Sequence, residues 1–295
     1  MPLVIKKEVF TSFFILYSYI LLGDFMNKLK IIGILILTGF TFFYTDKVSK
    51  ILRNNDPIMN RIDNIKDTMT ISKIDPVIYD DEYITGINGC VVNREESYKK
   101  MKSNGEYNSD LIVMKEDKVD DEYNKYVIGG PKQNRKVSII LINYDEKINS
   151  FIKENNIDIN YFIDGSSIKK DIGKLLELEG KIYYYGRDKK YLDKYILYDN
   201  SLIKSNFNNE SNYCLVNEKD NNTLEICSKY KMKTIKTNEI KVNVLNYVKE
   251  NLGNGKIFLI DSNYEDIKYS INYILSKGYK IVYLDELLDK TNDCR

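Results

Sequence analysis

Polar residues that could do chemistry follow an apolar run in the middle of the chain. Residues 137–142 read Val-Ser-Ile-Ile-Leu-Ile, and Asn143, Tyr144 and Asp145 come directly after them. Such a run is typical of a strand buried on both faces of a parallel sheet, and ligands bind at the carboxyl ends of such strands. Asp145 is therefore a candidate for acid-base or metal chemistry. The alternative is an ordinary cap of the helix that follows.

Three more acidic residues stand at the ends of strand-like segments: Asp164, Asp188 and Asp261. Together with Asp145 they could supply oxygen ligands to a hard cation, but each also suits a helix cap, and we predict no metal and no cofactor. The chain has no His, the side chain whose ordinary pKa lies nearest neutral pH. Acid-base catalysis would then fall to carboxylates or cysteines, with Asp145 and Asp261 as the catalytic candidates if the protein is active.

Alternating strand and helix patterns from residue 136 onward position these residues. Repeated β-α units of this length predict an α/β fold, either a parallel barrel or a doubly wound sheet. The expected strands are 137–142, 157–163, 181–185, 212–216, 234–235, 255–261 and 279–284, and the expected helices are 167–178, 222–230, 242–252 and 264–276.

The region before residue 136 divides into three predicted parts. Residues 26–48 combine Met26, a basic flank and an apolar run, which is typical of a signal anchor, and residues 1–25 are either an upstream extension or the first half of a membrane hairpin. This predicts a single-pass membrane protein with its main domain extracellular. Residues 49–76 are expected to form a polar stalk, and residues 77–130 a small β-rich module.

Composition limits the partners and the redox state. A hydrophobic fraction of 43% indicates a folded protein, and a formal charge of +1 gives no electrostatic reason to expect nucleic acid as a partner. The four cysteines form no C-x-x-C pair. Cys214 and Cys227 flank a predicted strand and helix, so they are either a disulfide or two separately buried thiols.

The order of these signals resembles the polysaccharide deacetylase family. Residues 157–165 (IDINYFIDG), 255–261 (GKIFLID) and 273–287 (YILSKGYKIVYLDEL) carry the resemblance, which covers residues 136–288. It implies a distorted (β/α) barrel that acts on, or binds, N-acetylated glycans outside the cell.

Members of that family hold a divalent metal with one Asp and two His, and a neighbouring Asp serves as general base. Carried over by position, the paired acids fall on Tyr144 and Asp145, so one of the two is kept. The first imidazole position falls on Tyr185 and Gly186.

Two further motifs of the family also differ in this chain. Its Arg-Pro-Pro motif would fall near residues 213–216 and is absent, and its late acid His would be Ile260, beside Asp261. One carboxylate does not hold a catalytic zinc, which needs three protein ligands. The departures therefore argue against the usual metal-dependent hydrolysis.

These residues leave three functional hypotheses. The first is a pseudoenzyme that binds cell-wall glycan or an envelope protein, and the second is an active hydrolase of N-acetyl bonds in carbohydrate that uses a non-standard site. The third is a structural envelope protein. Tyrosine offers an apolar ring with a polar tip, which suits sugars, although with 25 tyrosines in the chain such a cluster can also be core. The predicted glycan-binding residues are Tyr144, Tyr183, Tyr184, Tyr185 and Tyr213.

Overall fold

The computed structural model describes residues 32–120, 122–185, 192–291 and 294, and divides into two compact units. The described part of the first unit comprises residues 32–68 and Asn93–Val113. The second unit comprises residues 69–92 and the described residues from Met114 onward. All residues discussed below as a functional site belong to the second unit.

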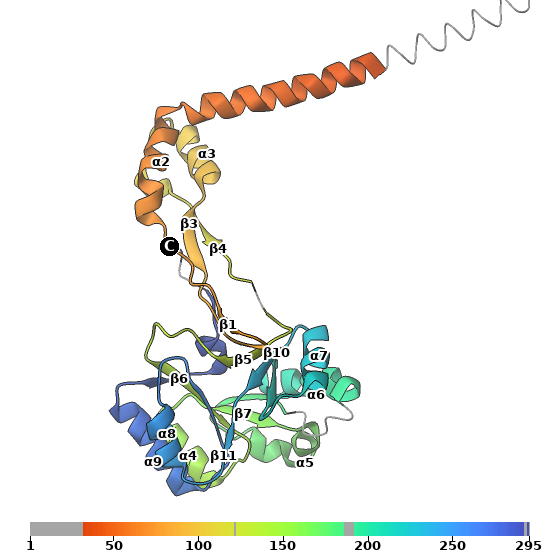
Figure 1. The fold of residues 1–295 in the computed structure, drawn as a ribbon, viewed down its shortest axis with the longest axis vertical. Helices are drawn as coiled ribbons and strands as arrows, with labels where there is room; N and C mark the ends of the chain where they lie inside the picture. The colour runs from red at the N-terminus through yellow and green to blue at the C-terminus, as the bar shows by residue number, and fades with distance from the viewer. Residues whose placement is uncertain (1–31, 121, 186–191, 292–293, 295) are drawn as a thin grey trace, which may run out of the picture. The chain divides into compact units, whose positions relative to one another are not determined.

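The first unit is helical (Figure 1). Residues 32–54 form one helix, and α2 (Pro57–Met69), α3 (Arg94–Asn104) and the short η1 (Ser109–Leu111) follow. Ile58 and Ile62, one turn apart, bury the same face of α2, and Asp63 of this helix forms two 2.7 Å hydrogen bonds with the Arg94 guanidinium. The region expected as a polar stalk therefore contains a packed helix, which begins at Pro57 because proline suits a first helical turn.

The prediction of a single-pass membrane protein is wrong in this structure. Within the described ranges, no helix has both the length and the apolar content needed to cross a membrane. The apolar run ends at Tyr44, and the same helix continues through charged residues, including the Asp46–Lys50 ion pair at 2.9 Å. Residues 1–31, with the first apolar run and the start of the predicted anchor, lie outside the described residues.

The second unit is built on two largely parallel sheets (Figure 1). One has the order β1-β2-β5-β10-β9, with only β1 antiparallel to its neighbour, and the other has the order β11-β12-β6-β7-β8, with β13 also paired to β6. A two-stranded antiparallel ribbon, β3-β4, completes the unit. The strands are β1 (Val77–Tyr79), β2 (Glu82–Ile84), β3 (Gly89–Val92), β4 (Met114–Asp117), β5 (Tyr126–Gly129), β6 (Lys136–Leu141), β7 (Asn160–Ile163), β8 (Lys181–Tyr184), β9 (Tyr213–Val216), β10 (Lys233–Lys236), β11 (Glu239–Ile240), β12 (Ile257–Ile260) and β13 (Lys280–Ile281).

Side chains alternate between two hydrophobic clusters along these strands. Ile140 and Ile142 join a cluster to which both sheets contribute, hereafter the inner cluster, whereas Ile139 and Leu141 join a cluster shared with the helices, hereafter the outer cluster. The alternation follows from the two-residue period of a strand. Strand β6 is therefore buried on both faces, as its continuous apolar sequence predicts.

Helices cover the outer faces of the sheets. In Figure 1, α4, α8 and α9 gather on one side of the unit and α5, α6 and α7 on the other. Their bounds are α4 (Glu146–Glu154), α5 (Gly165–Leu175), α6 (Leu192–Phe207), α7 (Asn221–Lys229), α8 (Val244–Asn251), α9 (Tyr264–Ser276) and α10 (Leu284–Leu287).

The residues expected to form a separate β-rich module are divided between the two units. Strands β2 and β5 lie in the same sheet as β9 and β10, and Tyr83 and Val127 belong to the inner cluster. Residues 93–113 belong to the first unit. Strand β5 pairs with β10, which comes more than 100 residues later, and local sequence patterns do not specify such a pairing.

Candidate functional site

A cavity of about 440 Å³ opens at the carboxyl ends of β6 and β7. The apolar residues that line it are buried ends of the two strands, and the remaining residues offer an amide, a phenol, a carboxylate and a hydroxyl. Its lining consists of Ile142, Asn143, Tyr144, Phe162, Ile163, Asp164 and Ser167. The place is the one that a parallel sheet favours for ligands, and the mixed lining can donate and accept hydrogen bonds.

Asn143 connects this cavity to the neighbouring strand β12. Its Nδ2 donates a hydrogen bond to Oδ1 of Asp261, the residue that follows β12. Lys241 Nζ lies 3.5 Å from the other oxygen of Asp261 and 3.3 Å from Glu239 Oε2. Hydrogen bonding to Glu239 is the main reason that the pKa of Lys241 is raised. Asp261 therefore lies between an amide and an ammonium group.

Asp145 caps helix α4. Its Oδ1 accepts hydrogen bonds from the backbone N–H groups of Lys147 at 2.8 Å and Ile148 at 3.3 Å. The carboxylate satisfies two donors that the first turn of a helix leaves without partners. Asp145 does not line the 440 Å³ cavity. The catalytic roles of Asp145 and Asp261 therefore stay predictions.

Asp164 caps helix α5 in the same manner. Burial opposes ionisation, but hydrogen bonds from the hydroxyl and backbone N–H groups of Ser166 and Ser167 outweigh it and lower the pKa of Asp164. The carboxylate is thus anionic at neutral pH, and Ser167 Oγ, 2.9 Å from Asp164 Oδ2, is oriented by it.

The residues present do not fit the family's metal. The chain has no His, and within the described ranges no three Asp, Glu or Cys side chains form a group able to hold an ion. Asp188, one of the four acids of the hypothetical oxygen-ligand site, lies outside the described residues, as does Gly186. We therefore derive no step through a metal.

Three of the five predicted glycan-binding tyrosines are core residues. Tyr183, Tyr184 and Tyr213 are 0%, 5% and 6% exposed. The Tyr183 ring stacks on Phe162 and meets Tyr213 edge-on, each at 5.3 Å between centroids, and its hydroxyl donates to Asp285 Oδ2 at 2.9 Å. Rings packed in this way have no face left for a sugar.

The other two predicted tyrosines are only partly buried. Tyr185 packs against the inner cluster and Tyr144 against the outer one. The Tyr144 hydroxyl donates a hydrogen bond to Asp171 Oδ2 at 2.9 Å. Burial, assisted by this bond, raises the pKa of Tyr144 to about 12, so the phenol stays protonated at physiological pH. Of the five, only Tyr144 lines the cavity.

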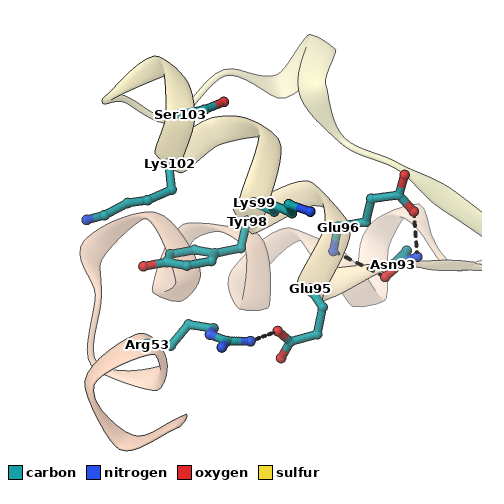
Figure 2. A pocket seen from close by; sticks show the side chains of 8 residues that line it. All are labelled: Arg53, Asn93, Glu95, Glu96, Tyr98, Lys99, Lys102 and Ser103. Atoms are coloured by element: carbon teal, nitrogen blue, oxygen red, sulfur yellow. Dashed lines mark hydrogen bonds and ion pairs between the residues drawn. The ribbon is translucent and has the colours of Figure 1, made fainter. Parts of the chain in front are cut away.

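A separate cavity of about 640 Å³ lies in the first unit. Figure 2 shows Tyr98 between Arg53 and Lys102, and the Asn93 side chain joined to Glu96. The charged groups are largely paired with one another: Arg53 with Glu95, and Lys102 with Asp56 at 2.7 Å. Its other lining residues are Lys99 and Ser103. This pairing suits helix packing and capping, and we assign no chemistry to it.

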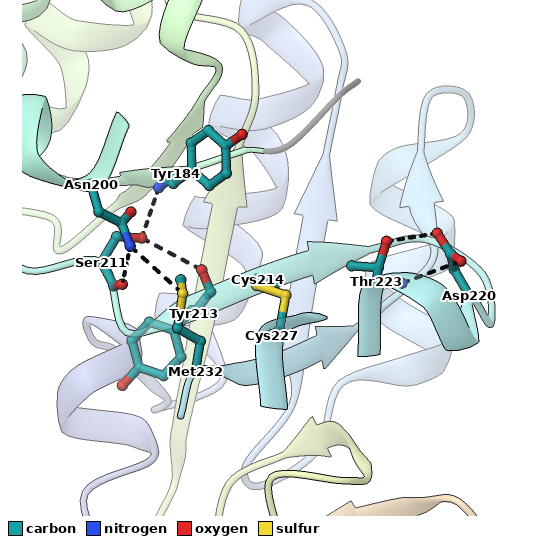
Figure 3. The surroundings of a disulfide bond; sticks show 9 residues. All are labelled: Tyr184, Asn200, Ser211, Tyr213, Cys214, Asp220, Thr223, Cys227 and Met232. Atoms are coloured by element: carbon teal, nitrogen blue, oxygen red, sulfur yellow. Dashed lines mark hydrogen bonds between the residues drawn. A yellow bond between two sulfur atoms is a disulfide. The ribbon is translucent and has the colours of Figure 1, made fainter. Parts of the chain in front are cut away.

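Two disulfides cross-link the second unit. Cys214 of β9 is joined to Cys227 of α7 beside Met232 (Figure 3). Cys90 of β3 is joined to Cys294, near the end of the chain. Sequence reasoning did not find the second bond, because its partners are 204 residues apart; the even cysteine count was the one available signal.

The fold has counterparts among solved structures. A wild-type pseudoenzyme of the CE4 family from Bacillus anthracis is 16% identical, with a TM-score of 0.56 over 81% of this chain and 97% of that one. A mutant of that pseudoenzyme with restored enzymatic activity is 17% identical, with a TM-score of 0.54 over 80% of this chain and 100% of the other. No protein-family sequence model and no curated protein sequence matches the chain. The chain has a polysaccharide deacetylase-like fold.

Proposed function

We propose that the protein is a glycan-binding pseudoenzyme with a polysaccharide deacetylase-like fold. The observation that carries the proposal is the 440 Å³ cavity at the carboxyl ends of β6 and β7. Its volume lies within the range of about 300–1,000 Å³ that small-molecule sites occupy, and its lining combines apolar and hydrogen-bonding groups, as a sugar surface does.

The acidic residues in and near this cavity do not support hydrolysis. Asp145 and Asp164 are engaged as helix caps, and Asp261 is engaged by Asn143 and Lys241. A general acid or base needs a pKa near the working pH, and the lowered pKa of Asp164 moves it the other way. The proposed ligand is an N-acetylated cell-wall glycan.

The proposal includes the arrangement of the sheets. We take them as two sides of one distorted (β/α) barrel, with the inner cluster as its interior. Support comes from that cluster, because Tyr83 and Ile235 of one sheet and Phe162 and Leu259 of the other share it. In such a barrel the cavity would lie at the end where the βα loops gather.

Binding and catalysis are tested together with tetra-N-acetylchitotetraose as probe. The full-length protein is incubated with it, with and without added zinc, magnesium or calcium, and mass spectrometry follows loss of acetyl groups while calorimetry measures binding. We expect binding without deacetylation under every condition. Loss of acetyl groups would overturn the pseudoenzyme proposal, and absence of binding would overturn the glycan proposal.

Tyr144→Ala provides the site-specific variant. It removes the one aromatic side chain that reaches the cavity from the loop after β6, and we expect binding to weaken by about 5- to 30-fold, as for the loss of a ring contact of about 1–2 kcal/mol. Tyr269→Ala is the matched control, because Tyr269 is 55% exposed on α9 and does not line this cavity. Equal affinity of both variants, with intact melting curves, would count against this cavity.

A further inference from the structure

Three cations gather at the amino end of β6, the end opposite the cavity. Arg135 directly precedes β6, Lys277 directly follows α9, and Lys249 lies in the last turn of α8. Strands β6 and β13 pair in parallel at their first residues, and the Lys280 N–H donates a hydrogen bond to the Arg135 carbonyl at 2.8 Å. Helices α8 and α9 pack against each other. The fold therefore brings together three side chains, hereafter the cation cluster, from separate segments of the chain.

Two aromatic rings position the cation cluster. Lys249 Nζ and Lys277 Nζ lie 5.7 Å and 5.2 Å from the centroid of the same ring, that of Tyr273. Arg135 Cζ lies 5.8 Å from the centroid of Tyr279, and its Nη1 donates a 3.4 Å hydrogen bond to the Lys277 carbonyl. That bond uses one of the five N–H donors of a guanidinium. The rings attract the cations without using their hydrogen-bond donors.

The cation cluster keeps its positive charge. Its three side chains are exposed, and none of them forms an ion pair within the parts of the chain that the structure describes. Glu286, an acid at this end of the sheet, is shared by Lys136 and Lys280, at 3.1 Å from each. Glu250 follows Lys249 in α8, but consecutive residues do not face each other on a helix. The positive charge is thus local, because the formal charge of the whole chain is only +1.

A ligand for this surface should be a polyanion. Like charges held near one another repel, so an anionic chain that bridges them is favoured, and ammonium and guanidinium groups form strong hydrogen bonds to phosphate oxygens. Tyr273 and Tyr279 pack against the outer cluster, and their rings already meet the cations. They are therefore poor platforms for stacking nucleobases, which single-stranded nucleic acids require. The chemistry favours phosphate groups on a chain without bases.

We propose that the cation cluster binds a linear polymer of phosphodiester-linked polyol units. Each cation contacts one phosphodiester, and the polyol units span the distances between the three cations. This site lies at the end of β6 opposite the cavity, so the proposal does not depend on the glycan function.

Fluorescence anisotropy with a labelled oligomer of glycerol phosphate tests the proposal. The full-length protein is titrated at salt concentrations between about 50 and 200 mM. Three phosphate contacts predict a slope of about −2 for the logarithm of affinity against the logarithm of salt concentration, on the relation for single strands. An oligothymidylate of equal charge should bind no tighter, because base stacking adds nothing at this surface.

Variants that remove one charge localise the site. Lys249→Gln should weaken binding about three- to fivefold at low salt and make the slope shallower by about 0.7, whereas Lys249→Arg keeps the charge and should keep the affinity. The triple variant that adds Arg135→Gln and Lys277→Gln should lose the salt-dependent binding. Lys268→Gln is the matched control: Lys268 is also on α9, lies over a tyrosine at 5.4 Å from the Tyr264 centroid, and forms no ion pair in the described ranges. It lies nine residues, about 13 Å, before Lys277 along the helix, and its loss should change the affinity little.

Three results would overturn the proposal. The first is wild-type affinity in the triple variant with an intact melting curve. The second is an equal loss for Lys249→Gln and Lys268→Gln, which would mean that only the total charge matters. The third is tighter binding of the oligothymidylate, which would assign the surface to nucleic acid. Binding of the glycerol phosphate oligomer with the expected slope, lost only in the variants of the cation cluster, would support the proposal.

Discussion

Removal of the Cys90–Cys294 disulfide should destabilise the second unit more than removal of Cys214–Cys227. The two bonds close loops of 204 and 13 residues. A disulfide stabilises mainly by restricting the unfolded chain, and the chain-entropy relation gives about 5 kcal/mol for the long loop and about 3 kcal/mol for the short one. The difference of about 2 kcal/mol arises only from the logarithm of loop length.

Alanine is the appropriate replacement at each position. Cys90 and Cys227 are fully buried and Cys214 is 3% exposed, so serine would leave a buried hydroxyl without a partner. After loss of Cys90–Cys294, the chain end still has folded-state contacts: the Asn88 N–H donates to the Lys290 carbonyl at 2.7 Å, and Lys290 Nζ donates to the Asp120 carbonyl at 2.6 Å. The effect should therefore lie mostly in the unfolded state.

Urea denaturation of the two double-alanine variants measures this difference. Wild-type protein with reductant should lose stability, and a variant without any cysteine should not respond to reductant, which isolates the sulfur chemistry. A loss for Cys214→Ala with Cys227→Ala that equals or exceeds the loss for Cys90→Ala with Cys294→Ala would refute the loop-length reasoning.

Two further predictions concern the start of α5. A Cβ on Gly165 would lie 2.2 Å from Asp199 Cγ, and since Asp199 is 7% exposed, Gly165→Ala should lower the free energy of unfolding by about 1–3 kcal/mol in thermal unfolding. Gly173→Ala is the control: a Cβ there would meet nothing within 4 Å, so this variant should be stabilised. A loss for Gly165→Ala that persists in an Asp199→Ala background would contradict the clash. Asp164→Ala should cost about 0.5–2 kcal/mol at neutral pH through the lost cap. Because the pKa of Asp164 in the folded state lies below its ordinary value of 3.8, the stability that its carboxylate supplies is present above pH 3.8 and is lost as the pH falls through the folded-state pKa. If Asp164→Ala lowers the stability by the same amount in acid as at neutral pH, the stability does not depend on the ionisation of Asp164.

Local sequence patterns were sufficient for the elements around the site. The apolar run at 137–142 predicts β6, and α9 spans the predicted residues 264–276. The helix-cap alternative for Asp145 is likewise a local property, because a cap involves only the next three residues. The position of the cavity at strand ends follows from the parallel α/β pattern.

Helix α6 shows where local patterns fail. Its buried residues Leu192, Ile196 and Ile203 are accompanied by exposed Leu197 and Tyr198, at 61% and 51%. Apolar residues on all sides of a helix give no one-sided period, so the sequence pattern does not predict a helix there.

The sequence by itself determined the α/β alternation, the helix caps and the absence of imidazole chemistry, because each depends on residue types or on neighbours within a few positions. Only the tertiary structure decided which tyrosines are core residues, since Tyr183 and Tyr213 face the inner cluster once their strands take their register. It also decided the Cys90–Cys294 pairing, which closes a loop of 204 residues. These features join segments far apart in the chain, and contacts of that range depend on packing rather than on local propensity.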